Sequence, residues 1–236
     1  MSTQHNAARK RLDRASVINA AIAFADAEGV ESLSMRALAS SLGVVPMALY
    51  KHVSDKEDLI GGMVDAIIAE YPEPHAGDGW RARVRTRVLA AHEALLEHPW
   101  LGRAIESRTR RTEAVLAHMN AVAGDFIDDG VSADLVHYAM HALGNRIWGF
   151  SREAFDDADA PTPEDADNPD IFAYMTERFP HVVEIAMDAA SRNPTGGCDT
   201  QTEFEFTLDL LLDGIERLHV AGWVSRPHPA GPASLE

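Results

Sequence analysis

One short stretch of this sequence, LGVVPMALYKHVSDKEDL, carries side chains that suit contact with a nucleic acid. Donor groups that match DNA phosphates gather in its second half: Tyr50, Lys51, His52 and Lys56. Apolar atoms that can meet thymine methyl groups in a major groove come before them: Val45, Pro46 and Met47. Arg36, a few residues earlier, suits a guanine edge or a phosphate. This pattern indicates DNA recognition.

Two short predicted helices would place these side chains on one surface. Ser34 is a suitable cap for the first of them, Gly43 supplies the turn, and Pro46 opens the second helix, where its missing N–H costs nothing. Leu49 and Val53 point inward in this register, which turns the groups named above outward. Two helices joined in this way form a helix-turn-helix, whose second helix enters the major groove.

A further helix is expected to follow directly. Ser54 and Glu57 have the spacing of a capping box, with the serine at the cap. Gly61 and Gly62 lie inside this helix, where each costs roughly 1 kcal/mol relative to alanine. Two explanations stay open: the helix pivots there between a ligand pocket and the DNA-binding head, or it packs closely against a neighbouring helix.

The segments AEGVESLSMRALASSLGV and ALYKHVSDKEDL resemble the tetracycline-repressor (TetR) family of regulators. The resemblance covers residues 13–70, and FEFTLDLLLDGIERL near the end is similar to the last helix of the branch around the tetracycline repressor. It implies a ligand-responsive, homodimeric transcriptional regulator, most often a repressor, that binds a palindromic operator and is released by a small molecule. It also implies that Tyr50, His52 and Lys56 contact phosphates while the helix at 46–52 reads bases.

Charge is divided unevenly along the 236 residues, whose net charge is −16. Residues 1–53 hold six Lys or Arg and four acidic residues, whereas the rest of the chain holds 15 and 33. DNA is repelled by such an acidic surface, so any contact must be local. The single cysteine, Cys198, excludes an internal disulfide, and no signal peptide or apolar run of membrane-spanning length occurs. We therefore expect a cytoplasmic protein.

The spacing of apolar residues predicts an all-α chain, with a small helix-turn-helix domain followed by a larger helical domain. Beyond the first four helices we expect others at 80–97, 100–107, 110–128, 132–155, 170–192 and 202–221. An acidic, proline-rich loop at 156–169 and a break at 193–200 separate the last of these. The expected organisation is a flexible basic arm at 1–12, a DNA-binding domain at 13–70, a ligand-binding and dimerisation domain at 71–225 and a disordered tail at 226–236.

Two apolar stripes suggest how a dimer forms, which a helix-turn-helix needs in order to read two half-sites. Their residues recur at helical spacing and would form a four-helix interface: Val136, Met140, Leu143 and Ile147, then Phe204, Leu208, Leu211, Ile215 and Leu218. The alternative is that both stripes face the core of their own subunit.

Aromatic, sulfur-containing and polar side chains suggest a small-molecule pocket between helices. The candidates are His92, Trp100, Met119, His137, His141, Asn145, Trp148, Phe172 and Met175, and core packing remains the alternative for each. His137 and His141 have the i, i+4 spacing of a metal-binding pair, but no third ligand is evident, so no metal or cofactor is predicted.

Enzymatic motifs are missing. HEALLEH at 92–98 resembles a zinc-protease signature, but Leu96 replaces the second metal ligand, and no phosphate loop, dinucleotide fingerprint or nucleophile elbow occurs. We therefore expect no enzyme. The alternative to a repressor is a helical small-molecule-binding or metal-sensing protein without specific operator binding.

Overall fold

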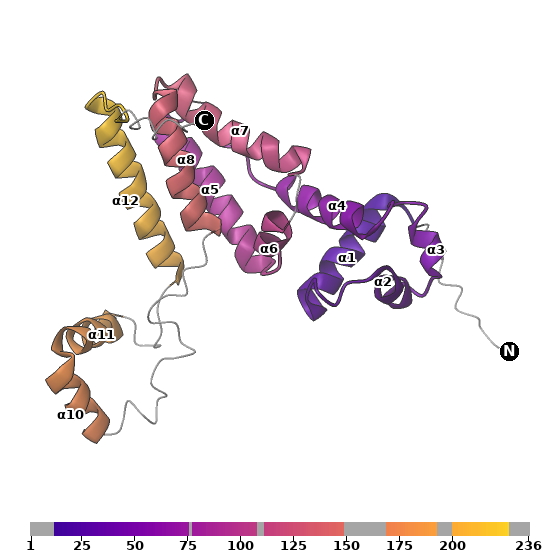
Figure 1. Ribbon diagram of the computed structural model, residues 1–236, viewed down its shortest axis with the longest axis horizontal. Coiled ribbons are helices and arrows are strands. Elements are labelled where there is room, and N and C mark those ends of the chain that lie inside the picture. Colours follow the sequence, from indigo (N-terminus) through magenta and orange to yellow (C-terminus); the bar gives the residue numbers. More distant parts are fainter. Residues whose placement is uncertain (1–11, 76, 108–110, 149–168, 193–199, 227–236) are drawn as a thin grey trace, which may run out of the picture. The chain divides into compact units, whose positions relative to one another are not determined.

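The computed structural model describes residues 12–75, 77–107, 111–148, 169–192 and 200–226, and all regular secondary structure in these ranges is helical (Figure 1). The chain divides into two compact units, with the boundary after His137. In the described ranges, no helix is both long and apolar enough to cross a bilayer. The all-α prediction is confirmed.

The first unit contains a head and three further helices. The head consists of α1 (Arg14–Glu28), α2 (Met35–Ser41), α3 (Pro46–Leu49) and α4 (Lys56–Ile68). The helices that follow are α5 (Trp80–Glu97), α6 (Leu101–Glu106) and α7 (Glu113–Asp128). Within this unit α4 packs against α1 and also against α6 and α7. The predicted domain boundary near residue 71 stays a prediction.

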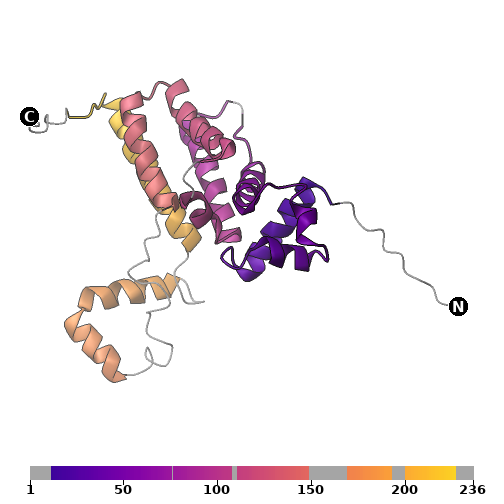
Figure 2. The same cartoon turned by 45° about the vertical axis from the view of Figure 1, so that its right-hand side comes forward.

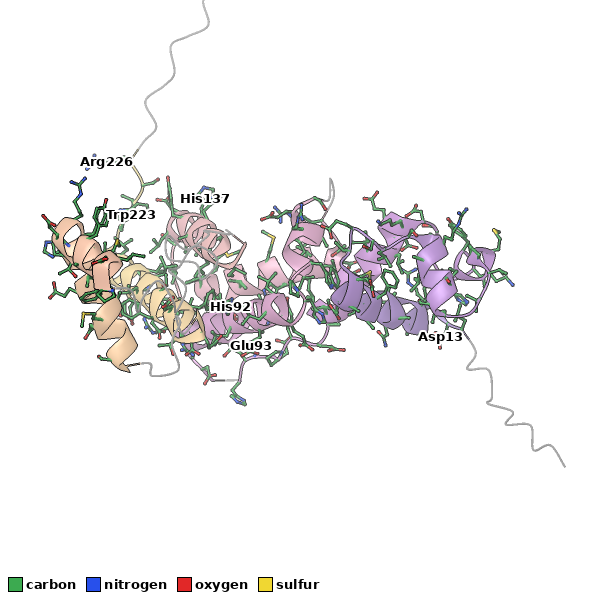
Figure 3. All side chains as sticks on the ribbon, turned by 90° about the horizontal axis from the view of Figure 1, so that it is seen from below. Asp13, His92, Glu93, His137, Trp223 and Arg226 are labelled. Carbon is green, nitrogen blue, oxygen red and sulfur yellow. The ribbon has the colours of Figure 1, made fainter. Side chains whose placement is uncertain are left out.

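Local capping fixes where the head helices begin. Asp13 caps α1 in a reciprocal box with Ser16, at the point labelled in Figure 3. The Ser34 hydroxyl accepts from the Ala37 N–H at 3.1 Å, as its predicted capping role requires. Pro46 occupies the first turn of α3, also as predicted.

The predicted start of α4 is wrong by one residue. Asp55, not Ser54, is the cap, and its carboxylate accepts from the Asp58 N–H at 2.8 Å. The third residue of the helix is therefore Asp58 instead of Glu57, and its carboxylate accepts from the Ser54 N–H at 2.8 Å. Ser54 and Glu57 have the sequence pattern of a capping box, but Asp55 is an equally good cap residue, so the pattern alone does not fix the register.

A close approach holds α4 against α1. A methyl group added at Gly62 would lie 2.7 Å from Ile18 Cδ1 and 3.4 Å from Arg14 Nη2. Ile18 would have to shift to admit such a methyl group, which supports the close-packing explanation for this glycine. Figure 2 shows α4 leading from the head helices toward α7.

An ion-pair cluster joins α5 to α7. The Asp125 side chain is almost fully buried and accepts from Arg83 Nε at 3.0 Å and from Arg87 Nε at 2.8 Å. Arg83 also binds Asp129 at 3.1 Å, and the Trp80 N–H donates to the same carboxylate at 2.6 Å. The hydrogen bond from Arg83 lowers the pKa of Asp129. Each buried charge is thus paired, as burial demands.

The second unit contains most of α8 (Ala133–Trp148), together with α10 (Pro169–Arg178), α11 (Pro180–Arg192) and α12 (Thr200–Val220). The single helix predicted at 170–192 is wrong, because Pro180 begins a separate helix there. Residues 149–168, 193–199 and 227–236 lie outside the described residues. They include the continuation of the predicted 132–155 helix, nearly all of the predicted loop at 156–169 and of the break at 193–200, and most of the predicted tail.

Candidate DNA-binding surface

The outward face of α3 is exposed and apolar at its start. Val45 and Met47 are 66% and 70% exposed, whereas Leu49 and Val53 on the inner side are buried. Pro46 is exposed between them. The predicted register of this helix is therefore confirmed, with a protruding apolar surface that no residue of the head covers.

Donor groups border this apolar surface. Tyr50 is 45% exposed, Lys51 and Lys56 are exposed, and His52 is half-buried. Arg36 is exposed on α2, the helix that precedes the turn. Lys56 lies in the first turn of α4, where free backbone N–H groups also favour an anion. The arrangement combines groups for base contacts with groups for phosphate contacts, and the contacts themselves stay a prediction.

Arg14 and Asp58 form an ion pair next to this surface that the sequence analysis did not predict. Arg14 donates from Nη2 to Asp58 Oδ1 at 2.7 Å and from Nη1 to Oδ2 at 3.1 Å. The same Nη1 donates to the His52 carbonyl oxygen at 2.8 Å. The hydrogen bond from Arg14 lowers the pKa of Asp58 to about 2, and the bond from the Ser54 N–H acts in the same direction. The pair joins residues 44 positions apart, so no local spacing could reveal it.

A second set of contacts ties the head to the end of α5 and to α6. Asp26 of α1 accepts from Trp100 Nε1 at 2.6 Å and lies 2.8 Å from His98 Nδ1. Arg103 of α6 pairs with Glu31 at 3.0 Å, in an exposed position. The two contacts of Asp26 tie α1 to the segment between α5 and α6, whereas the exposed Glu31–Arg103 pair adds little.

The predicted pocket residues are spread over many elements. In the first unit, His92 is half-buried on α5 (Figure 3), Trp100 is buried with its indole N–H bonded to Asp26, and Met119 is partly exposed on α7. His137 and His141 are exposed on α8. In the second unit, Phe172 is exposed and Met175 is half-buried on α10, and the side chains of Asn145 and Trp148 lie outside the description. The pocket stays a prediction.

Other polar atoms are enclosed near the junction of α4 and α7. Asp65 Oδ1 and the Tyr71 hydroxyl are buried without a hydrogen-bond partner. The Tyr71 ring stands edge-on to His118 of α7, with 5.2 Å between the ring centroids. Burial raises the pKa of Tyr71 to about 12 and, with the nearby Arg87 charge as a lesser cause, lowers that of His118. Both rings are therefore neutral near pH 7.

Much of the two predicted dimer stripes is buried in the single chain. Phe204, Leu208 and Ile215 are buried, as the alternative of core packing expects, and a part for them in a dimer stays a prediction. The same holds for Val136 and Leu143 on α8. Met140, Ile147 and Leu211 are half-buried and Leu218 is exposed. The opposite side of α12 instead exposes a different stripe: Phe206, Leu210, Asp213, Arg217 and Val220.

No group of three metal-binding side chains forms among the described residues. His137 and His141 therefore gain no third ligand from the part of the chain that the structure covers.

A helix-turn-helix with an exposed second helix, followed by helices that are tied to it, defines a class of DNA-binding transcriptional regulators. Residues 17–63 match the family described as bacterial regulatory proteins, tetR family. Residues 72–219 match the tetracyclin repressor-like C-terminal domain. The chain belongs to the TetR family of transcriptional regulators.

Relatives support this assignment along nearly the whole chain. Tetracycline repressor protein class G of Vibrio anguillarum is 29% identical over 215 residues, which are 89% of this chain and 97% of that protein. The structure of a TetR-type transcriptional regulator from Streptomyces coelicolor matches with a TM-score of 0.65 and 25% identity, covering 92% of this chain and all of that one. ActR of the same organism, solved with actinorhodin, matches with a TM-score of 0.63 and 24% identity over 90% of this chain and 98% of its own.

Proposed function

We propose that this protein is a homodimeric repressor that reads a palindromic operator through α3 and leaves it when a small organic molecule binds. The observation that supports it most is the face of α3, where exposed Val45 and Met47 precede exposed Tyr50 and Lys51. Such a face offers apolar contacts to base edges and donors to the flanking phosphates. The repressor would work in the cytoplasm, where bacterial operators are.

Operator binding is tested with a duplex selected from a random-sequence library by the wild-type protein. We expect enrichment of an inverted repeat with half-sites about one helical turn apart or a multiple of it. Because the net charge of the chain is −16, only local cations can hold DNA, and affinity for the selected duplex should fall steeply as salt rises. Failure to enrich any sequence would refute the proposal.

Two substitutions separate base reading from phosphate contact. Met47→Ala should weaken binding to the selected duplex by roughly 5- to 150-fold and leave random DNA nearly unaffected, as expected for a base contact. Lys51→Ala should weaken both duplexes about equally and reduce the slope of affinity against salt by about one, as expected for a phosphate contact. Leu96→Ala, which truncates an exposed leucine of α5 outside the head, is the control for a lost surface side chain.

We propose that the exposed stripe of α12 forms the dimer interface. Phe206 and Leu210 are more than half exposed although they are large and apolar, and Asp213 and Arg217 continue the same side of the helix. A paired copy of the helix would remove this apolar area from water. Leu210→Glu should convert the dimer into a monomer in sedimentation experiments, whereas Leu116→Glu on the exposed side of α7 should not.

We propose that the effector binds where α4 meets α7. The enclosed Asp65 Oδ1 and Tyr71 hydroxyl need hydrogen-bond partners, which a bound molecule with donor and acceptor groups would supply. The names of the relatives motivate a test panel that contains tetracycline and actinorhodin. A binding compound should raise the melting temperature of the wild type, and Tyr71→Phe should reduce that shift. An unchanged shift would exclude the Tyr71 hydroxyl as a contact.

A further inference from the structure

The Arg14–Asp58 pair ties together three segments of the head. Arg14 is the first residue of α1, and its guanidinium holds both carboxylate oxygens of Asp58 in α4, at 2.7 and 3.1 Å. It also binds the backbone carbonyl of His52, in the turn between α3 and α4, at 2.8 Å. Such forked, two-point contact fixes relative orientation as well as distance, which a single point charge does not.

Asp58 completes the connection from the other side. Its Oδ2 accepts from the Ser54 N–H at 2.8 Å and lies 3.3 Å from the Ser54 hydroxyl. The Ser54 N–H precedes α4 and has no helical partner, so this carboxylate takes the place of a backbone acceptor. The turn at residues 52–54 is thus held at its carbonyl by Arg14 and at its N–H by Asp58.

The held turn lies between the groups that suit DNA phosphates. Tyr50, Lys51 and His52 immediately precede the Ser54 contact, and Lys56 follows it in the first turn of α4. Arg14 therefore contacts both the carboxylate in α4 and the carbonyl in this turn.

We propose that Arg14 and Asp58 are positioning residues for operator binding, which hold the α3–α4 turn and the start of α4 in the spacing that matches successive phosphates. This inference rests on the proposed function. It gives an acidic residue, Asp58, an essential part in binding DNA. The direction in which DNA affinity changes when Asp58 is neutralised tests this. Loss of a negative charge should by electrostatics alone tighten binding to DNA. Loss of the positioning contact should weaken it.

Asp58→Asn is the decisive variant. It keeps an oxygen that can accept from Ser54 but removes the charge that holds the guanidinium. We expect its affinity for the duplex selected by the wild type to fall by about tenfold, a typical coupling within one contact network, while affinity for random duplex changes less. Glu31→Gln is the matched control, because Glu31 has an exposed ion pair with Arg103 and its loss changes the charge of the protein equally. Its affinity should stay equal to that of the wild type or rise slightly.

Arg14→Lys provides a second measurement if Asp58→Asn does not fold, as judged by helical circular dichroism at 25 °C. Lysine keeps the charge but cannot span both carboxylate oxygens and the His52 carbonyl. We expect weaker operator binding with an unchanged salt dependence. Equal or tighter operator binding by folded Asp58→Asn, or by Arg14→Lys, overturns the inference. A wild-type protein that enriches no duplex refutes the proposed function instead, so the two failures are distinguishable.

Discussion

Asp26 on α1 accepts a hydrogen bond from the indole N–H of Trp100, 74 residues later in the chain, at 2.6 Å. The Trp100 side chain is buried, so Asp26 is the partner that the structure shows for its N–H. His98 lies 2.8 Å from the same oxygen of Asp26. This single carboxylate connects the DNA-binding head to the segment between α5 and α6, and any movement between them must break or carry these contacts.

Removal of the Asp26 carboxylate should lower the stability of the folded protein. Asp26→Ala leaves the Trp100 N–H buried without an acceptor, and we expect the free energy of unfolding to fall by about 1–3 kcal/mol. Urea unfolding followed by circular dichroism measures it. Glu31→Ala, which breaks an exposed ion pair between α6 and the loop that follows α1, should change the same quantity by less than about 1 kcal/mol. Equal effects of the two variants would contradict a special role for Asp26.

Disruption of the ion-pair cluster between α5 and α7 should lower the free energy of unfolding by more than the loss of Asp26 does. Asp125→Ala removes the one carboxylate shared by Arg83 and Arg87, whose side chains are themselves mostly buried. The two guanidinium groups lose their most buried partner and keep Asp129 and the exposed Glu73 as acidic partners, so the free energy of unfolding should fall by about 3 kcal/mol, the low end for a broken buried pair. Thermal and urea unfolding check this.

The control for this cluster is Glu73, which binds Arg87 at 3.0 Å from a largely exposed position. Glu73→Gln should cost less than about 1 kcal/mol, because water replaces the lost partner. A cost for Asp125→Ala as small as that for Glu73→Gln would show that water reaches the two arginines.

Local patterns in the sequence sufficed to predict the helices of the head and the exposed face of α3. The inward positions of Leu49 and Val53 follow from helical periodicity, and Ser34 and Pro46 have strong positional preferences, so the exposed face of α3 could be predicted. The Arg14–Asp58 and Asp26–Trp100 contacts could not, because they join distant segments whose approach depends on the packing of whole helices.

The two apolar sides of α12 show what periodicity in the sequence does not predict. α12 is apolar on two sides, with Phe204 and Leu208 on one and Phe206 and Leu210 on the other. Periodicity identifies both sides equally well, but it does not say which one packs within the subunit. The regular stripe can face a partner or its own core; Phe204, Leu208 and Ile215 are buried in the single chain, whereas Leu218 is exposed.

Alanine substitutions at Gly62 and at Gly124 should change the free energy of unfolding in opposite directions. Alanine favours a helix by about 1 kcal/mol over glycine, but at Gly62 its methyl group would lie 2.7 Å from Ile18 Cδ1. Overpacking costs about 1–3 kcal/mol, so Gly62→Ala should lower the free energy of unfolding by roughly 1 kcal/mol. Gly124→Ala on α7, where an added methyl meets nothing within 4 Å, should raise it. Stabilisation by both substitutions would show that α1 and α4 adjust easily to the added methyl group. The pivot at Gly61–Gly62 stays a prediction.

The lowered pKa of Asp58 predicts how acid affects the head. Because its pKa is about 2 in the folded protein and 3.8 in the reference state, the folded state favours the ionised form. The stability contributed by this carboxylate is therefore complete above pH 4 and is lost as the pH falls from there toward 2. Melting temperatures of the wild type and of Asp58→Asn, measured between pH 2 and pH 6, should differ most at pH 5–6 and converge near pH 2. A difference that stays constant over this range would mean that the Arg14–Asp58 pair does not stabilise the fold through its charge.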